Sequence, residues 1–142
     1  MKNIEISADK SRLDKDMIID FLHRHSYWAK DRPDEVVVKS IDNSYCIGAY
    51  LDGKQVGFAR IVTDFSTMYY LAEFFVVPEY QGQGVGEQLM CYIDTLEEFK
   101  ELRGYLTTRF AHSFYERHGY TRDHVVVRER IMVKEAEKNN RL

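Results

Sequence analysis

The sequence predicts one α/β domain of the α+β kind, with a mixed, mostly antiparallel central sheet and helices on both faces. Three observations predict it: two helical segments come first, three strand segments follow close together, and strand and helix then alternate. A length of 142 residues and a hydrophobic content of 44% suit a single core. We expect residues 1–134 to form this domain and residues 135–142 to form a polar tail.

The first elements are a short strand and two helices. Residues 3–7 can form the strand. Asp14 is a residue type that caps helices, and apolar residues at helical spacing follow it until the helix ends near residues 23–26. Pro33 suits the first turn of the second helix, and the two acidic residues after it favour the positive end of the helix dipole.

Three strands come next. Residues 45–51 and 55–63 flank the pair Asp52-Gly53, which is typical of a tight hairpin. The third strand, residues 68–77, is apolar on both faces near its end. Such a strand is covered on both faces, which predicts a central place in the sheet.

The last part of the chain alternates between helix and strand. We expect a helix over residues 84–99, a strand over 105–109, a short helix over 111–118 that Gly119 ends, and a strand over 128–133.

Composition excludes several classes of protein. Lys and Arg number 20 against 23 for Asp and Glu, so the basic excess of a nucleic-acid-binding protein is missing. The apolar runs are too short to span a membrane and the N-terminus is too polar for a secretory signal, so we expect a cytoplasmic protein. Cys46 and Cys91 are far apart, and His23 and His25 point to different sides of a helix. We therefore expect no metal site.

A glycine-rich turn lies between the central strand and the next helix. It has three glycines at alternate positions in the order Gln81, Gly82, Gln83, Gly84, Val85 and Gly86. Glycines permit close approach and positive φ, so the turn and the helix N-terminus can bind a pyrophosphate; a tight turn without a ligand is the alternative. Glu87 follows where a P-loop needs Lys, and the upstream antiparallel hairpin disfavours a dinucleotide fold.

The sequence around this turn resembles the GNAT superfamily of acetyl-CoA-dependent N-acetyltransferases. Gln81, Gly84 and Gly86 match the phosphate loop of the family, and residues 74–80 and 114–120 match the flanking strand and the later tyrosine segment. Residues 60–64 with Ala111-His112 resemble a branch of small bacterial members whose substrates are mostly unassigned. The sequence departs from the pattern in two places. Thr108 stands where many members have Asn, and Phe110 stands where the branch often has an acidic residue.

The resemblance implies acetyl-CoA as cosubstrate and a set of site residues. The backbone of Phe75, Val76 and Val77 would bind the pantetheine arm, the turn from Gln81 to Gly86 the pyrophosphate, and Thr108 a coenzyme or water contact. Tyr115 is the expected acid for the departing thiolate. Glu73, a carboxylate in an otherwise apolar strand, is the expected base, and an ion pair with Arg60 or Arg109 is the alternative.

The expected acceptor is a small-molecule or peptide amine. Tyr27 and Trp28, after the first helix, are candidates to line its pocket, with packing as the alternative. His112, one helical turn before Tyr115, belongs either to a proton path or to the helix surface. The alternative functions are an acyl-CoA-binding regulatory module without turnover and a protein-interaction domain. The resemblance allows a monomer or a homodimer.

Overall fold

The structure, a computed structural model, describes residues 3–122 in two compact units, Met1–Ala111 and His112–Leu142. The first unit contains a five-stranded sheet in the order β1-β2-β3-β4-β5. The strands are β1 (Glu5–Ser7), β2 (Tyr45–Leu51), β3 (Lys54–Thr63), β4 (Met68–Val76) and β5 (Arg103–Leu106). Neighbours from β1 to β4 pair antiparallel and β5 pairs parallel with β4, which confirms a mixed, mostly antiparallel sheet. The expected strand over residues 128–133 lies outside the described residues.

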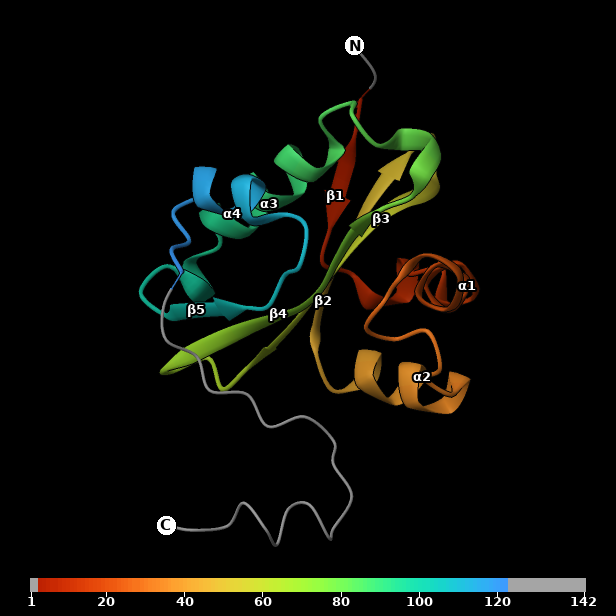
Figure 1. Ribbon diagram of the computed structural model, residues 1–142, viewed down its shortest axis with the longest axis horizontal. Helices are drawn as coiled ribbons and strands as arrows, with labels where there is room; N and C mark the ends of the chain where they lie inside the picture. Colours follow the sequence, from red (N-terminus) through yellow and green to blue (C-terminus); the bar gives the residue numbers. More distant parts are fainter. Residues whose placement is uncertain (1–2, 123–142) are drawn as a thin grey trace, which may run out of the picture. The chain divides into compact units, whose positions relative to one another are not determined.

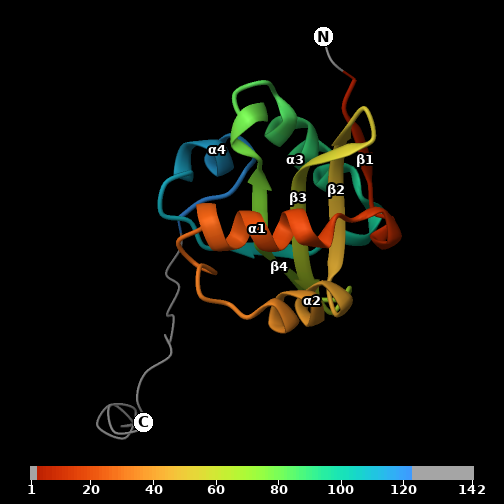
Figure 2. The same cartoon turned by 90° about the vertical axis from the view of Figure 1, so that its right-hand side faces the viewer.

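Helices cover both faces of this sheet. Figure 1 shows α1 (Lys15–His25) and α2 (Asp34–Asp42) on one side and α3 (Val85–Thr95) on the other. In Figure 2, α1 and α2 lie in front of the central strands and α3 lies behind them. Short 3-10 turns η1 (Lys10–Arg12), η2 (Pro78–Tyr80) and η3 (Glu97–Phe99) connect the elements. The expected arrangement of helices is confirmed.

Each face has its own apolar core. The core under α1 and α2 consists of the buried residues Ile18, Phe21, Leu22, Ala29, Val37, Ile41, Cys46, Phe58 and Phe75. The core under α3 contains the buried residues Ala49, Leu51, Val56 and Val85. Strand β4 contributes to both cores: Phe75 lies in the core under α1 and α2, and the half-buried Val76 packs against the core under α3. Its buried residues alternate with half-buried ones, which agrees with a sequence that is apolar on both faces.

Short-range features of the sequence determine the start of α1 and the hairpin between β2 and β3. The Asp14 carboxylate accepts a hydrogen bond from the Met17 amide at 3.0 Å and caps α1. The hairpin between β2 and β3 turns at Asp52 and Gly53, whose φ angles are 51° and 80°. Two positive φ angles in a row match the right-handed twist of paired strands, and the Asp-Gly pair therefore sets the register of this hairpin.

Two expected boundaries are wrong. The helix expected over residues 84–99 ends at Thr95, because Leu96 is extended with ψ 122° and η3 follows it. The apolar stripe continues past the end of the helix because Phe99 is still buried, now from η3. The strand expected over residues 105–109 is β5 at Arg103–Leu106. Its residues pair with the start of β4. The range expected from the sequence therefore begins and ends too close to the C-terminus.

An extra residue in β4 changes which face its side chains reach. Ile61 pairs with Leu71 and Arg60 pairs with Glu73, so Ala72 is left over as a β-bulge. Before the bulge, Tyr69 contacts the ring of Phe99 with centroids 5.4 Å apart. After it, Phe75 stacks on Phe21 of α1 at 3.7 Å. Simple alternation would send residues 69 and 75 to the same face; the bulge sends Glu73 and Phe75 to the face of α1 and α2.

The described part of the second unit is the helix α4 (His112–Arg117) and the turn after it. Gly119, at φ 89°, ends the helix, and the Tyr120 amide donates to the Tyr115 carbonyl at 3.1 Å. A glycine in the left-handed conformation is the usual end of a helix, and the expected stop at Gly119 is confirmed.

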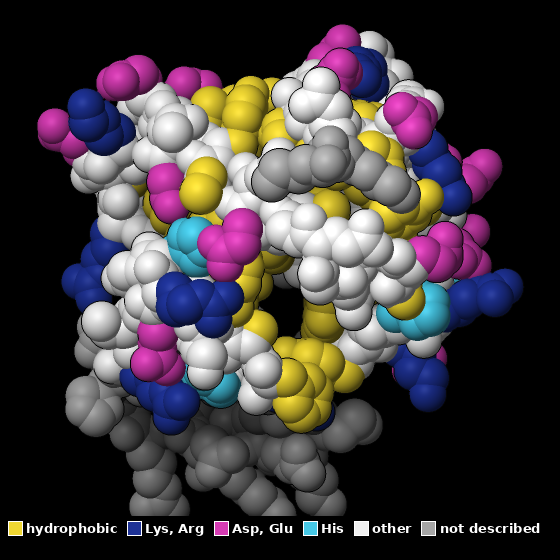
Figure 3. Space-filling model, turned by 90° about the horizontal axis from the view of Figure 1, so that it is seen from above, with side chains coloured by type: hydrophobic (Ala, Val, Ile, Leu, Met, Phe, Trp, Pro, Cys, Tyr) yellow, Lys and Arg dark blue, Asp and Glu magenta, His cyan; other side chains and the backbone are white. Residues whose placement is uncertain are grey.

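Charges of both signs share the surface. On the face drawn in Figure 3, basic and acidic side chains are interspersed and neither forms a continuous patch. Within residues 3–122, no helix has both the length and the apolar content needed to cross a bilayer.

Candidate functional site

The glycine-rich turn joins β4 and η2 to α3. Gly82 and Gly84 have φ angles of 75° and 85°, and nothing lies within 4 Å of the position that a Cβ would take on either. Gly84 is the N-cap of α3 and has no side chain to bond the first amides. A helix leaves the amides of its first turn without partners inside the helix, and its dipole is positive there. The turn therefore presents uncrowded backbone at the positive end of α3, which suits an anion.

The pairing of β4 with β5 stops before β4 ends. Pairing between β4 and β5 runs from Met68–Arg103 to Leu71–Leu106 in the described residues, whereas β4 continues to Val76. The edge of β4 that faces away from β3 is thus not paired with β5 beyond Leu71. An unpaired strand edge offers backbone donors and acceptors to an extended ligand.

The direction of the backbone groups along this edge follows from one hydrogen bond. The Val77 amide donates to the Val56 carbonyl of β3 at 2.9 Å. Because the two sides of a strand alternate, the amide and carbonyl of Val76 face away from β3. The Val76 carbonyl accepts from the Gln81 side chain at 2.8 Å. Of the three backbone positions expected to bind pantetheine, Phe75 and Val77 face β3, and Val76 faces the edge that β5 does not pair with.

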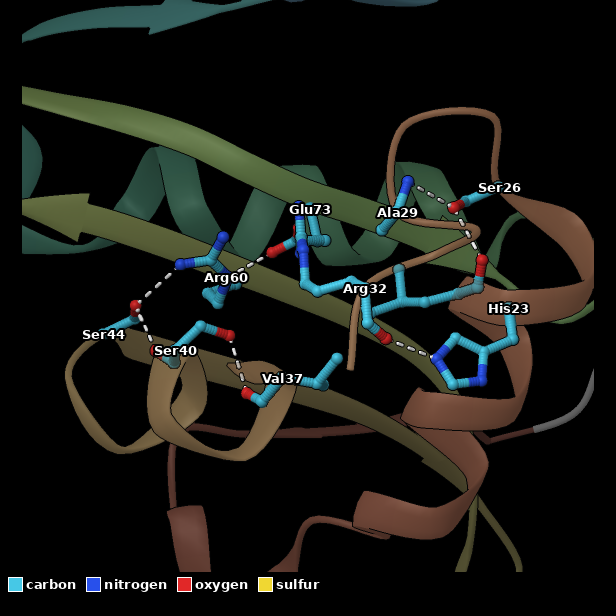
Figure 4. A network of polar contacts seen from close by, with 10 residues as sticks. His23, Ser26, Ala29, Arg32, Val37, Ser40, Ser44, Arg60 and Glu73 are labelled. Carbon is cyan, nitrogen blue, oxygen red and sulfur yellow. Dashed lines mark hydrogen bonds and ion pairs between the residues drawn. The ribbon is translucent and has the colours of Figure 1, made fainter. Parts of the chain in front are cut away.

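Glu73 lies between two arginines on the face of α1 and α2. Only 2% of its side chain is exposed. One carboxylate oxygen accepts from Arg32 Nη1 at 2.8 Å, and the other accepts from Arg60 Nε (Figure 4). Arg60 is directly opposite Glu73 on β3, while Arg32 reaches it from the loop between α1 and α2. Both oxygens of the carboxylate are therefore engaged in ion pairs.

These ion pairs determine the protonation of Glu73. Burial by itself would raise the pKa of the carboxyl group, because it disfavours the charged form. The hydrogen bonds and positive charges of Arg60 and then Arg32 outweigh burial and hold the pKa below its usual range. Glu73 is ionised at neutral pH, and a proton added to it would cost both charge-assisted hydrogen bonds.

The same network fixes the loop between α1 and α2. The carbonyl of Arg32 is 2.7 Å from His23 Nε2, and the Ser26 hydroxyl donates to the Leu22 carbonyl at 2.7 Å (Figure 4). On the other side Arg60 donates to the Ser44 hydroxyl at 3.1 Å. The loop is thus bonded to α1 at both ends and to β4 through Glu73.

Tyr27 and Trp28 lie in this loop and are exposed by 41% and 38%. Their rings meet edge to face at 5.1 Å, and Phe110 meets Tyr27 in the same way at 5.6 Å. The Arg109 amide donates to the Tyr27 hydroxyl at 3.0 Å, and the Arg109 guanidinium lies over the Tyr27 ring at 4.6 Å. The loop is therefore also attached to the segment that leaves β5.

The remaining expected site residues are Thr108, Tyr115 and His112. The Thr108 hydroxyl follows β5 and accepts from the Ala111 amide at 3.1 Å. Tyr115 lies in α4, in the second unit, where its ring contacts those of Phe114 and Tyr120 at 5.2 and 5.9 Å. His112 is the first residue of that helix. Within residues 3–122, no group of three His, Cys, Asp or Glu side chains could hold a metal ion.

The sequence does not predict the contacts of three residues. Arg32 stands in a loop whose path no pattern predicts. Arg109 is an expected alternative partner of Glu73, and it contacts Tyr27 instead. Phe110 departs from the pattern of the family, but nothing in the sequence places it beside Tyr27. A buried carboxylate needs compensation for its charge, so Glu73 itself indicates that cations lie nearby, but it does not say which ones.

Comparison with known proteins agrees with this geometry. An acetyltransferase (GNAT) domain matches residues 42–122. The crystal structure of a candidate GNAT-family acetyltransferase from Xanthomonas campestris pv. campestris is 39% identical, covers 87% of both chains and superposes with a TM-score of 0.84. A candidate acetyltransferase of Gibberella zeae is 27% identical over 78% of this chain and 70% of its own. An aminoglycoside N-acetyltransferase in complex with CoA has the same fold, with a TM-score of 0.65 at 20% identity over 92% and 96% of the chains.

The fold and the glycine-rich turn thus define an acyltransferase domain. The family model covers more than half of the chain, and the Xanthomonas relative aligns along most of its length. The chain belongs to the GNAT acetyltransferase family.

Proposed function

We propose that the protein transfers the acetyl group of acetyl-CoA to a primary amine by direct attack on the thioester. The observation that carries the proposal is the end of β4–β5 pairing at Leu71, while β4 continues toward a turn with two left-handed glycines. An extended arm can add along the edge of β4 that β5 does not pair with, while its pyrophosphate reaches the start of α3. The aminoglycoside N-acetyltransferase with the same fold is named as a complex with CoA, which supports the choice of ligand.

In this proposal the coenzyme contacts are mainly backbone groups. Gly82, Gly84 and the first turn of α3 bind the pyrophosphate. The Val76 amide and carbonyl bind the pantetheine arm, and the Gln81 side chain must first release the Val76 carbonyl. These roles depend on φ angles and strand geometry, so they tolerate many side chains but few changes of glycine.

The reaction needs a neutral amine, a stabilised oxyanion and a proton for the thiolate. The amine nitrogen forms a bond to the carbonyl carbon, and the carbon–sulfur bond breaks. Tyr115 is the proposed donor of the proton that the sulfur takes up. The acceptor amine approaches from the loop that carries Tyr27 and Trp28, because this loop is bonded both to Glu73 and to the segment after β5.

Glu73 has a supporting part in this proposal. A general base must accept a proton, and a carboxylate held by Arg32 and Arg60 accepts one only at the cost of both ion pairs. We assign Glu73 the task of holding Arg32, and through it the acceptor loop, against β4. Solvent takes one proton from the acceptor ammonium before the attack. After the attack the nitrogen loses a second proton through solvent, and Tyr115 regains from solvent the proton that it gives to the sulfur.

The test is release of free thiol from acetyl-CoA in the presence of a panel of primary amines, including polyamines, aminoglycosides, amino acids and lysine peptides. Amine-dependent release above the uncatalysed rate, with the N-acetylated product found by mass spectrometry, supports the proposal. Tight binding of acetyl-CoA without turnover for any amine would contradict it and favour a regulatory acyl-CoA-binding module. The absence of binding would favour a protein-interaction domain.

A further inference from the structure

We propose that the rings of Tyr27, Trp28 and Phe110, here called the aromatic surface, bind a flat apolar group carried by the amine acceptor. The inference rests on the proposed function and names the class of acceptor: a primary amine with an aromatic ring a few atoms from the nitrogen.

The three rings of the aromatic surface are exposed to water. Phe110 has 83% of its surface in water, and its neighbours in the aromatic surface are exposed by 41% and 38%. The rings touch in sequence, Trp28 to Tyr27 and Tyr27 to Phe110, and each contact is edge to face. They come from segments more than 80 residues apart, joined by the bond from the Arg109 amide to Tyr27. A contiguous cluster of exposed rings indicates a binding surface more strongly than a single exposed side chain does.

The aromatic surface is connected to β4 and to the segment after β5. The loop with Tyr27 and Trp28 is bonded to β4 through Arg32 and Glu73, at the strand residue that follows the bulge. Phe110 belongs to the segment that leaves β5, four residues after the strand ends. The aromatic surface is therefore attached to β4 at Glu73 and to the segment after β5, beside the stretch of β4 along which the pantetheine arm lies in the proposed function.

The chemistry of the aromatic surface favours a neutral flat group over a cation. Phe110 and Trp28 offer ring surface, and Phe110 has no polar atom in its side chain. A cation would usually be attracted to such rings, but the Arg109 guanidinium already lies over Tyr27 at 4.6 Å and would repel a second positive charge. A neutral flat group meets no such repulsion and gains ring contacts and apolar burial. The ammonium group of the acceptor must then lie away from this surface, toward the thioester.

The test compares four primary amines whose non-reacting part differs in shape and charge. These are 2-phenylethylamine, with a flat ring; 2-cyclohexylethylamine, with a bulky apolar ring; butylamine; and spermidine, with several positive charges. Trp28 is the only tryptophan in the chain, so its fluorescence reports binding at this surface without any need for turnover. Titration calorimetry gives the same dissociation constants independently.

We expect 2-phenylethylamine to bind about 10-fold more tightly than butylamine or spermidine and to change the Trp28 emission. Phe110→Ala should weaken its binding about 10-fold and leave butylamine within twofold. Phe110→Leu, which keeps an apolar side chain but not a flat one, should weaken it nearly as much. The matched control is Phe65→Ala, since Phe65 is 54% exposed but contacts Tyr45 and Phe99 instead.

Equal binding of all four amines, or an equal loss for all of them in Phe110→Ala, would overturn the inference. So would a dimer that Phe110→Ala converts to a monomer, because the aromatic surface would then be a contact between two copies. These binding results do not depend on the proposed function. If butylamine is acetylated but phenylethylamine has no advantage, only the inference fails; if phenylethylamine binds best and no amine is acetylated, only the proposed function fails.

Discussion

The guanidinium of Arg32 and the carboxylate of Glu73 are 2.8 Å apart, although one residue lies in a loop and the other is 98% shielded inside the sheet. Because Arg60 holds the second oxygen, the carboxylate has two cationic partners and almost no water. A buried charge of this kind is stable only while its partners stay in place. The position of the loop and the ionisation of Glu73 are therefore linked.

Replacing Glu73 by Gln should destabilise the protein by about 3 kcal/mol, since it leaves two arginines without their counter-charge. We take the low end of the usual range because the Arg32 side chain keeps 24% exposure to water. Urea unfolding followed by circular dichroism measures the change. Glu101→Gln, at an exposed glutamate, is the matched control and should change stability by less than about 0.5 kcal/mol. A loss in Glu73→Gln no larger than in this control would show that the ion pairs contribute little.

The kinetics of Glu73→Gln show whether Glu73 acts as a general base or holds the loop that carries Arg32. If Glu73 holds the loop, the variant should raise KM for the amine several-fold at every pH, and the shape of the pH profile of kcat should stay as in the wild type. If Glu73 is the base, kcat should fall most at low pH, where fewer amines are already neutral. Steady-state rates across the pH range separate the two outcomes.

The ion pair between Arg32 and Glu73 also makes the stability of the protein depend on pH. The folded-state pKa of Glu73 is lowered, so its contribution to stability is complete above the unfolded pKa of about 4.3 and is lost as pH falls through the lower folded value. The free-energy difference between wild type and Glu73→Gln should therefore be constant near neutral pH and shrink in acid. Asp64, whose pKa is lowered by the hydrogen bonds from Thr67, is present in both proteins and cancels. A difference that is unchanged in acid would exclude the lowered pKa.

Patterns along the chain predicted the elements better than they predicted the site. Helical spacing after Asp14 and the Asp-Gly pair at Asp52 act over a few residues, and both features are confirmed. The bulge at Ala72 has no local signal, because it arises from the pairing of β4 with β3. It decides that Glu73 faces α1 and α2, so that Arg32 becomes its partner. Contacts between distant segments depend on such shifts of register, and period-2 reasoning does not reveal them.

Replacing Gly84 by Ala should weaken coenzyme binding. Its φ of 85° costs an L-residue roughly 1–2 kcal/mol, although no atom crowds a Cβ there. The matched control is Gly53→Ala in the β2–β3 hairpin, where φ is 80° and the surroundings are equally open. Both variants should lose similar stability in urea unfolding. Only Gly84→Ala should lose affinity for acetyl-CoA by calorimetry, and equal affinities in the two variants would remove the turn from the coenzyme site.

The two cysteines should react differently with a thiol reagent. Cys46 is 2% exposed, and burial raises the pKa of its thiol to about 11, so the reactive thiolate is scarce. Cys91 is exposed on α3. One thiol per chain should be titrated quickly in the folded protein and two in urea, and Cys91→Ser should abolish the fast reaction. Fast titration of two thiols in the folded protein would contradict the burial of Cys46. The fast thiol must also be subtracted from any assay that detects released CoA.

Replacing Tyr115 by Phe tests the proposed acid. The change removes one hydroxyl and keeps the ring contacts with Phe114 and Tyr120, so the fold of α4 should be preserved. If the hydroxyl protonates the departing thiolate, kcat should fall by roughly 100-fold, within the usual range for loss of a general acid. The dissociation constant of acetyl-CoA should stay within about twofold, because the contribution of the acid is made in the transition state. Tyr120→Phe, which removes a hydroxyl from the neighbouring ring, is the control and should keep kcat. An unchanged rate in Tyr115→Phe would mean that solvent, or another donor, protonates the sulfur.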